Sequence, residues 1–304
     1  MDEAQLEKEI AALAVFRDRF SRLGSADSRE AGKDFKLEKD DIVISTPPKS
    51  GTTWMQQISH QLRSGGDMEF EEISEVVPFL EGSMETEVSL DRDQRFKPRL
   101  FKTHFWEPLT PKGGRYIIVI RHPYDTAVSS FKFMEGWMFE PGEISLETYV
   151  AEHFITRPKP GGILHHLASW WPRHADPDVL WVFYEDMKED LPAQVDRIAA
   201  FMGISDTATI AQAVHKSTFA FMKEHESQYN ELPLKRNRNV AIGLKPDAGM
   251  NQGKVRVGGG QQHLLSDRSK ALIDEAWRTI CQPVTGAASF AELRLAWKAE
   301  QSEK

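Results

Sequence analysis

One segment, residues 41–62, restricts the choice of fold more than any other part of the sequence. It begins with the β-branched run Asp41-Ile42-Val43-Ile44-Ser45-Thr46, which stops at Pro47-Pro48. Apolar residues then recur at every fourth position, at Trp54, Ile58 and Leu62. A β-branched run predicts a strand, and the four-residue spacing predicts one face of a helix. The segment therefore predicts a strand, a tight loop and a helix in direct succession.

The loop of this segment, Pro48-Lys49-Ser50-Gly51-Thr52-Thr53-Trp54, has the composition of a phosphate-binding turn. At a helix N-terminus the unpaired backbone amides and the positive end of the helix dipole converge, which favours a bound phosphate. Lys49 precedes Gly51 and no glycine lies upstream in the loop, so the Walker A spacing is absent and an ordinary NTPase is not the first choice. A simple strand-to-helix turn capped by Ser and Thr is the structural alternative.

Three further strands are predicted at Arg99–His104, Tyr116–Ile120 and Val179–Tyr184. Helical patterns lie between or after them, at Asp125–Met134 and Ala193–Met202. Continuous apolar strands that alternate with amphipathic helices indicate a parallel sheet covered on both faces. The fold class expected is α/β, with a central parallel sheet flanked by helices, in one domain over residues 1–304. An N-terminal helix with Leu6, Ile10 and Leu13 at helical spacing is expected to dock on this body.

Composition excludes several classes of function. The apolar runs are far shorter than the roughly 20 residues that span a bilayer, and the N-terminus lacks the pattern of a secretory signal, so we expect a cytoplasmic protein without a membrane helix. The single cysteine, Cys281, excludes an internal disulfide and a Cys-based zinc site. His165-His166 lacks metal-ligand spacing, so we expect no metal there and a surface or helix-start role instead. The net charge of −8 disfavours binding to nucleic acid.

Residues 230–262 form a locally basic stretch with six Lys and Arg against Glu231 and Asp247. It has several glycines and few large apolar residues, so it can bury little surface to offset the entropy of fixing its backbone. A solvated loop is one interpretation. The other is a mobile lid that becomes ordered when an anionic ligand binds, and we adopt it as the prediction.

The sequence resembles the cytosolic sulfotransferases, which move a sulfuryl group from 3′-phosphoadenosine 5′-phosphosulfate (PAPS) to a small acceptor. Five segments carry the resemblance in the family's order. They are Pro48–Trp54, which is similar to the 5′-phosphosulfate loop, Val77–Glu81, Lys102-Thr103-His104, Arg121–Ser129, which is similar to the 3′-phosphate signature, and Val182–Met187.

Two segments depart from the family pattern. Arg256-Val257-Gly258 keeps the Arg and Gly of the family's Arg-Lys-Gly segment but loses the Lys, and the Trp that follows is missing. The family's short dimerisation motif has no match in His263–Lys270, so dimerisation by that route is not predicted and the oligomeric state is left open.

The resemblance implies a role for each matching residue. His104 is implied as the general base toward the acceptor, Lys49 as the cation that stabilises the leaving phosphate, and Ser129 as a ligand of the 3′-phosphate that also holds Lys49 until the acceptor arrives. The residues implied in binding PAPS, or its product 3′-phosphoadenosine 5′-phosphate (PAP), are Lys49, Ser50, Gly51, Thr52, Thr53, Trp54, Arg121, Ser129, Tyr184, Ser217, Phe219, Arg256, Val257 and Gly258. The acceptor residues are Phe79, His104, Phe133, Met134 and Trp137, whose apolar character favours a phenol, a sterol or another hydrophobic alcohol or amine.

Two other functions remain as alternatives at this stage. A small-molecule kinase with an unusual phosphate loop would prefer ATP and need Mg²⁺. A protein that binds the nucleotide without turnover would have no need of a base, so the presence of both Lys49 and His104 argues against it.

Overall fold

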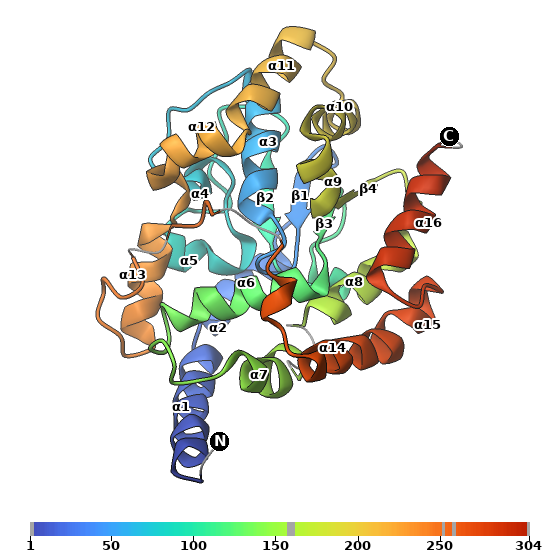
Figure 1. Cartoon of the computed structure of the whole chain (residues 1–304). Helices are drawn as coiled ribbons and strands as arrows, with labels where there is room; N and C mark the ends of the chain where they lie inside the picture. The colour runs from blue at the N-terminus through green and yellow to red at the C-terminus, as the bar shows by residue number, and fades with distance from the viewer. Residues whose placement is uncertain (1–2, 157–161, 251–252, 257–259, 303–304) are drawn as a thin grey trace.

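Four parallel strands form the sheet at the centre of the part of the chain that the structure, a computed structural model, describes: residues 3–156, 162–250, 253–256 and 260–302. Their order is β2-β1-β3-β4 (Figure 1). The strands are β1 (Ile42–Ser45), β2 (Leu100–Thr103), β3 (Arg115–Ile120) and β4 (Val179–Phe183). All pairings are parallel, so the four carboxyl ends lie at one edge of the sheet.

Both faces of the sheet are buried, because successive strand residues point into different cores. Val43 packs in a core with Phe101 and Ile118, whereas its neighbours Ile42 and Ile44 pack in the opposite core. Helices α3 (Thr52–Ser64), α10 (Leu191–Met202) and α11 (Thr207–Lys216) supply apolar side chains to the second core (Figure 1). The first core receives them from α1 (Glu3–Ser21), α6 (Pro123–Glu135), α8 (Ile163–Trp170), α14 (Asp267–Ile280) and α16 (Phe290–Ser302). The predicted parallel sheet covered on both sides is confirmed.

The helices have the following bounds. In chain order they are α1 (Glu3–Ser21), α2 (Ala26–Asp34), α3 (Thr52–Ser64), α4 (Ile73–Val76), α5 (Ser83–Thr86), α6 (Pro123–Glu135), α7 (Leu146–Tyr149), α8 (Ile163–Trp170), α9 (Tyr184–Glu189), α10 (Leu191–Met202), α11 (Thr207–Lys216), α12 (Phe219–Glu224), α13 (Leu232–Ala241), α14 (Asp267–Ile280), α15 (Gln282–Thr285) and α16 (Phe290–Ser302). Shorter turns are η1 (Leu80–Gly82), η2 (Glu107–Leu109), η3 (Val150–Phe154), η4 (Trp171–Arg173), η5 (Glu226–Tyr229) and η6 (Gln262–Leu264).

The four predicted strands lie within one residue of the observed bounds, but two helical details differ from expectation. In α1, Leu13 and Phe16 are buried whereas Ile10 is 58% exposed. The helix therefore contacts the body of the protein through its carboxyl-terminal half, and Ile10 is not part of that contact. The stretch 230–262 contains the ten-residue helix α13 and is therefore not a structureless loop. Its buried residues include Leu234, so it buries more surface than its composition suggested.

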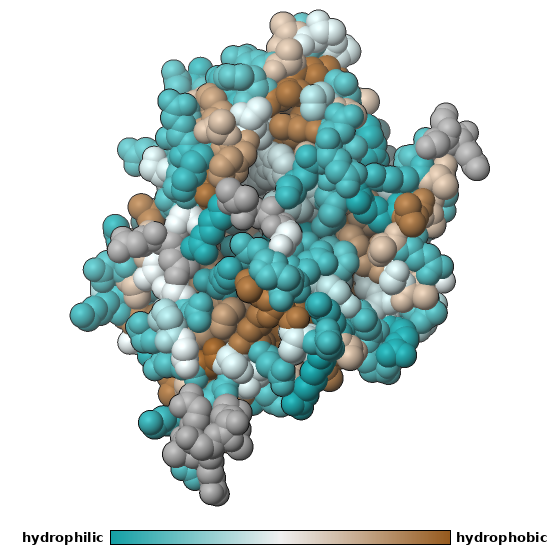
Figure 2. Space-filling model, viewed as in Figure 1, coloured by the Kyte–Doolittle hydropathy of each residue, from teal (hydrophilic) through white to brown (hydrophobic). Residues whose placement is uncertain are grey.

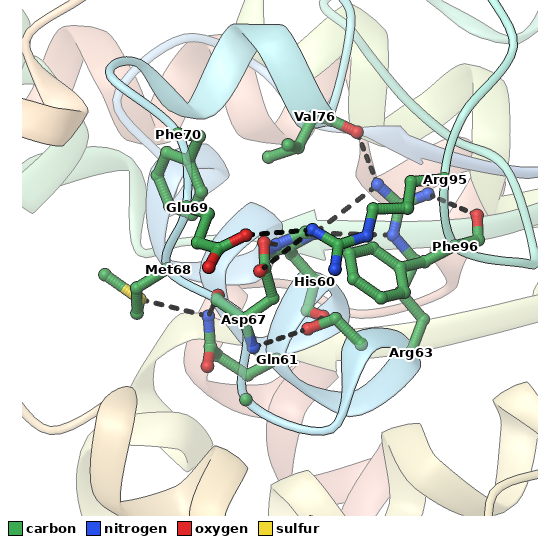
Figure 3. A network of polar contacts seen from close by, with 12 residues as sticks. His60, Gln61, Arg63, Asp67, Met68, Glu69, Phe70, Val76, Arg95 and Phe96 are labelled. Atoms are coloured by element: carbon green, nitrogen blue, oxygen red, sulfur yellow. Dashed lines mark hydrogen bonds and ion pairs between the residues drawn. The ribbon is translucent and has the colours of Figure 1, made fainter.

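A buried polar network holds the carboxyl end of α3 (Figure 3). The Arg63 guanidinium donates to the side chain of Gln94, at 2.6 Å, and to the carbonyl of Pro98, at 2.9 Å. His60 lies 3.4 Å from the Asp67 carboxylate, and burial lowers the pKa of the imidazole to about 3, so it is neutral at pH 7. The network fixes α3 against the segments that follow it, and the opposite end of this helix begins the candidate site.

The surface in the view of Figure 2 is mainly hydrophilic, with apolar side chains gathered near α11 and below α6. In the described part of the chain, every helix is too short or too polar to cross a bilayer.

Candidate active site

A cavity of about 740 Å³ opens at the carboxyl edge of the sheet. Most of the predicted site residues line it: Lys49, Gly51, Thr52, Thr53, Trp54, Phe79, His104, Arg121, Ser129, Phe133, Met134, Trp137, Tyr184, Ser217, Phe219 and Arg256. Ser50 is fully buried and is not among the lining residues. Val257 and Gly258 lie outside the described residues. Four of the lining residues follow directly from strands: Lys49 lies in the loop after β1, and His104, Arg121 and Tyr184 immediately follow β2, β3 and β4.

The loop after β1 has the backbone of an anion cradle. Lys49 and Gly51 both have positive φ, 70° and 103°, and Gly51 is the N-cap of α3 without any side-chain cap for the first amides. A Cβ at position 51 would lie 2.8 Å from the ring of Tyr184, so only glycine fits there. The uncapped amides and the helix dipole leave this end of α3 able to accept a phosphate.

Arg121 joins this loop to the end of β3. Its side chain is 6% exposed, and Nη1 donates to the carbonyl oxygen of Lys49 at 3.1 Å. The guanidinium carbon lies 4.4 Å from the centre of the Tyr184 ring. Its Nε is buried without a hydrogen-bond partner among the described residues, so the guanidinium can still bind a ligand.

Positive charge gathers around Lys49. Burial lowers the pKa of its ammonium well below 10.5, and the nearby charges of Lys254, Arg256, Arg121 and Lys235 lower it further. Among the described residues, ten basic side chains line the cavity against three acidic ones, although the whole chain has a net charge of −8. Three of these cations, Lys102, Arg121 and Lys235, are buried, and buried positive charge is costly unless an anion binds near it. The cavity is therefore suited to a ligand with several negative charges.

His104 has a defined tautomer. Its Nδ1 lies 2.8 Å from the carbonyl oxygen of Thr46, which can only accept, so Nδ1 carries the proton and Nε2 keeps its lone pair. Burial lowers the pKa of the imidazole to about 3, with a further contribution from the charge of Arg238. The ring also packs edge-to-face on Phe79, with 5.3 Å between centroids. At pH 7 the side chain is thus a neutral base held in one orientation.

Glu81, which was not predicted as a site residue from the sequence, contacts the backbone of this histidine. One carboxylate oxygen accepts from the hydroxyl of Thr103 at 2.6 Å, and the other accepts from the backbone N–H of His104 at 2.5 Å. Burial raises the pKa of this carboxyl to about 7. Its place in the Val77–Glu81 segment was the only sequence signal.

A second group of missed residues joins the basic stretch to β2. The carboxylate of Glu231 forms ion pairs with both Lys102 and Lys254 and accepts a hydrogen bond from Ser74. Each of the three charged side chains is at most 15% exposed, and all three residues line the cavity. Lys254 and Glu231 fall within the basic stretch, but charge counting alone does not reveal that they are paired.

Residues 39–263 match the family model described as the sulfotransferase domain. The chain belongs to the sulfotransferase family. It is 32% identical over 211 residues to human sulfotransferase 1E1, covering 66% of this chain and 72% of that protein. It is 31% identical over 241 residues to cytosolic sulfotransferase 1 of Danio rerio, covering 74% of this chain and 78% of that protein. The crystal structure of the mouse sulfotransferase SULT7A1 complexed with PAP matches with a TM-score of 0.64 at 22% identity, covering 85% of this chain and 90% of that one.

This membership confirms the family that five sequence segments predicted, and with it an enzyme that transfers a sulfuryl group. It removes the kinase and the non-catalytic binding protein as interpretations of the chain. The roles of single residues remain predictions, and the positions of these residues are described next.

The residues predicted to hold a nucleotide base lie on α3, at the start of α9, and at the start of α12 with the turn before it. Trp54 is on α3 and Phe219 begins α12, where its side chain is 48% exposed. The indole Nε1 of Trp54 donates to the carbonyl oxygen of Ser217 at 2.7 Å, which fixes the ring against the turn before α12. Tyr184 meets the Trp54 ring edge-on at 5.6 Å. The structure thus brings all four residues to one wall of the cavity.

Three of the apolar residues predicted for the acceptor lie together at the end of α6. Phe133, Met134 and Trp137 lie on or just after α6, and Phe133 meets Trp137 edge-on at 5.3 Å. The Lys49 ammonium lies 4.1 Å above the Phe133 ring. Lys49 and Ser129 both line the cavity, and the predicted contact between them is not among the hydrogen bonds of the described residues, so the role of Ser129 toward Lys49 stays a prediction. Phe20, near the end of α1, and Leu23, just beyond it, were not predicted from the sequence and also line the cavity.

Of the two roles expected for His165-His166, the helix-start position is observed, since both lie in the first turn of α8, whereas a surface position is wrong for His166. That residue is 2% exposed in α8, and its Nε2 lies 2.9 Å from the hydroxyl of Ser45 on β1. Helix α8 packs against the sheet and takes His166 into the core. Among the described residues, no group of three or more His, Cys, Asp or Glu side chains is placed to hold a metal.

Proposed function

We propose that this sulfotransferase moves a sulfuryl group from PAPS to the hydroxyl or amine of a small hydrophobic acceptor. The observation that carries the proposal is the meeting of two features in one cavity. The excess of basic side chains around Lys49 suits a polyanionic donor, and the neutral imidazole of His104 lines the same cavity.

In the proposed reaction the acceptor oxygen forms a bond to sulfur while the bond from sulfur to the bridging phosphate oxygen breaks. The acceptor proton passes to Nε2 of His104, which is free because Nδ1 is held by Thr46. The electron pair of the broken bond stays on the phosphate of PAP. Lys49, the amides at the start of α3 and Arg121 stabilise that charge, which is where electrostatic catalysis acts.

The cofactor contacts are assigned on the same basis. Arg121, Ser129 and Arg256 are proposed to bind the 3′-phosphate. The Nε of Arg121, which has no hydrogen-bond partner among the described residues, supports this because it can donate to a phosphate oxygen. Trp54 and Phe219 are proposed to enclose the adenine. The fit of Gly51 beneath Tyr184 supports a close approach of the phosphosulfate to the loop backbone.

The experiment is transfer of labelled sulfate from PAPS to a panel of phenols, aliphatic alcohols and amines. We expect transfer to hydrophobic acceptors, dependence on PAPS and no change on addition of EDTA, since the proposed steps need no metal. Phosphate transfer from ATP with Mg²⁺, or absence of sulfate transfer to every acceptor, would contradict the proposal.

We also propose that part of the stretch 230–262 closes over the bound cofactor. Lys254 and Arg256 line the cavity, and two bonds to α6 tie down the segment beyond them, from Lys132 to Gln261 at 2.9 Å and from Gln262 to Asp125 at 2.8 Å. Limited trypsin digestion with and without PAP tests this, with protection expected after Lys245 and Lys254. Equal cleavage rates would mean that the stretch does not respond to the cofactor.

A further inference from the structure

The cavity contains a charged side chain that the proposed reaction does not use. Arg238, on α13, lines the cavity together with Phe79 and His104. Its Nε is buried and has no hydrogen-bond partner in the described part of the chain. Burial lowers the pKa of this guanidinium, which still remains positively charged at neutral pH.

Two carboxylates act on the charge of Arg238, but neither forms an ion pair with it among the described residues. These are Glu81 and Glu85, which both stabilise its charge through space. Both oxygens of Glu81 already accept hydrogen bonds from Thr103 and His104. Oε1 of Glu85 accepts from the backbone N–H of Ser25 at 2.6 Å, and its buried Oε2 has no hydrogen-bond partner among the described residues, so it does not bond Arg238 either. A buried guanidinium without a bonded partner is costly and calls for a ligand group that accepts hydrogen bonds.

Phe79 relates this cation to the catalytic base. The ring packs edge-on against His104, with 5.3 Å between centroids, and the guanidinium carbon of Arg238 lies 5.5 Å from the same ring. His104 and Arg238 therefore both lie beside Phe79 in one cavity, where an acceptor packed on this ring is within reach of both side chains. Arg29, at the exposed rim of the cavity, adds a second positive charge near Arg238.

We propose that the acceptor of this sulfotransferase is an apolar hydroxyl compound with an anionic group, such as a carboxylate, on the side away from the reacting hydroxyl, and that Arg238 binds this anion. The proposal rests on the proposed function, since it takes His104 as the end of the cavity where sulfate is transferred. It assigns to α13 a role in selecting the acceptor in addition to covering the cavity.

The test uses three para-substituted phenols of similar length: 3-(4-hydroxyphenyl)propionate, 4-propylphenol and tyramine. We expect the wild-type full chain to have its highest kcat/KM with the propionate. In Arg238→Met, kcat/KM for the propionate should fall about 10- to 100-fold, as for loss of a charge-assisted hydrogen bond, with less than threefold change for 4-propylphenol. Arg238→Lys should recover part of the loss. Arg236→Met, an exposed neighbour on the same helix that does not line the cavity, is the matched control and should leave both values unchanged.

Equal losses for the propionate and 4-propylphenol in Arg238→Met would overturn the proposal, since they would indicate a structural pairing of Arg238 with Glu85. So would a wild-type preference for 4-propylphenol or tyramine. PAP affinity, measured by calorimetry, reports whether each variant is folded.

A measurement on the wild-type protein alone covers the case in which Arg238→Met fails to fold. The unreactive 3-phenylpropionate should bind the protein–PAP complex at least tenfold more tightly than 3-phenylpropanol, and binding no tighter than the alcohol would overturn the proposal. This binding test does not depend on turnover. Tighter binding of 3-phenylpropionate without any sulfate transfer would count against the proposed function only. Sulfate transfer to neutral phenols with no preference for the anionic compound would count against the role of Arg238 only.

Discussion

The carboxylate of Glu81 accepts a hydrogen bond of 2.5 Å from the backbone N–H of His104. The imidazole of the same residue donates from Nδ1 to the carbonyl of Thr46. The candidate base is thus held at two points, through its backbone N–H by Glu81 and through its ring by Thr46. Glu81 lines the cavity, and because its two oxygens accept hydrogen bonds from Thr103 and His104, we assign it the role of a positioning residue.

Glu81→Gln tests this positioning. A glutamine has one acceptor oxygen where the carboxylate has two, and its NH₂ group faces one of the two donors that the carboxylate accepted. We expect kcat to fall about 10- to 100-fold, because a small displacement of the base is costly, while PAP affinity by calorimetry stays within twofold. A parallel loss of PAP affinity would show that Glu81 supports the fold of the whole site instead.

His104→Ala removes the candidate base itself. A general base contributes roughly 10²- to 10⁴-fold, so kcat should fall by that factor while PAP binding is nearly unchanged. Single-turnover transfer from bound PAPS measures the chemical step directly. A variant with wild-type single-turnover rates would remove His104 from the mechanism.

Arg121 should discriminate PAP from AMP, which lacks the 3′-phosphate. Because Arg121 also holds the carbonyl of Lys49, we choose Arg121→Lys, which keeps the charge but loses the guanidinium fork. We expect PAP affinity to weaken by about 1.5 to 3 kcal/mol and AMP affinity by less. Equal weakening of the two nucleotides in calorimetry would contradict a 3′-phosphate role and leave a role in shaping the loop.

Glu231→Gln should shift the balance of charge in the cavity. The carboxylate pairs with Lys102 and Lys254, so its neutralisation leaves two buried ammonium groups without an anion. We expect a less stable free protein, a tighter complex with PAP at low salt, and a larger stabilisation by PAP in thermal unfolding. Lys254→Met is the matched opposite and should weaken PAP binding. The same change in PAP affinity in both variants would contradict this account.

The buried His166 should make stability fall as the pH drops. Burial lowers its pKa to about 3 in the native protein, against about 6.5 in an unfolded chain. Between these values the unfolded chain binds a proton that the native state does not, so native stability is present above pH 6.5 and is lost below it. From pH 7 to pH 5 the loss attributable to this group is about 2 kcal/mol.

The check is the free energy of unfolding in urea at both pH values for the wild type and His166→Asn. The decrease from pH 7 to pH 5 should be about 2 kcal/mol smaller in the variant. Glu81 has a raised pKa of about 7 and so acts in the opposite direction, but it is present in both proteins and cancels in the comparison. An identical pH dependence of the two proteins would show that His166 does not remain neutral in the native state.

The sequence by itself determined the sheet and the part of the site that follows from it. Strand and helix periodicity are local, and β-branched runs with Pro or Gly at their ends placed all four strands to within a residue. Lys49, His104, Arg121 and Tyr184 each follow a strand, and parallel strands bring their carboxyl ends to one edge. Their meeting in one cavity could therefore be predicted without knowledge of any tertiary contact.

Only the tertiary structure decided which charges face one another across that cavity. Lys102 and Glu231 are 129 positions apart and pair because α13 and the turn before it pack beside the end of β2. Arg238 meets Phe79 through the same packing, and His166 is buried because α8 lies against β1. No local pattern encodes these contacts, since a charged residue on an amphipathic helix has the same sequence signature whether it faces water or a cavity. The difference is set by burial, which makes each such charge costly and therefore dependent on its partner.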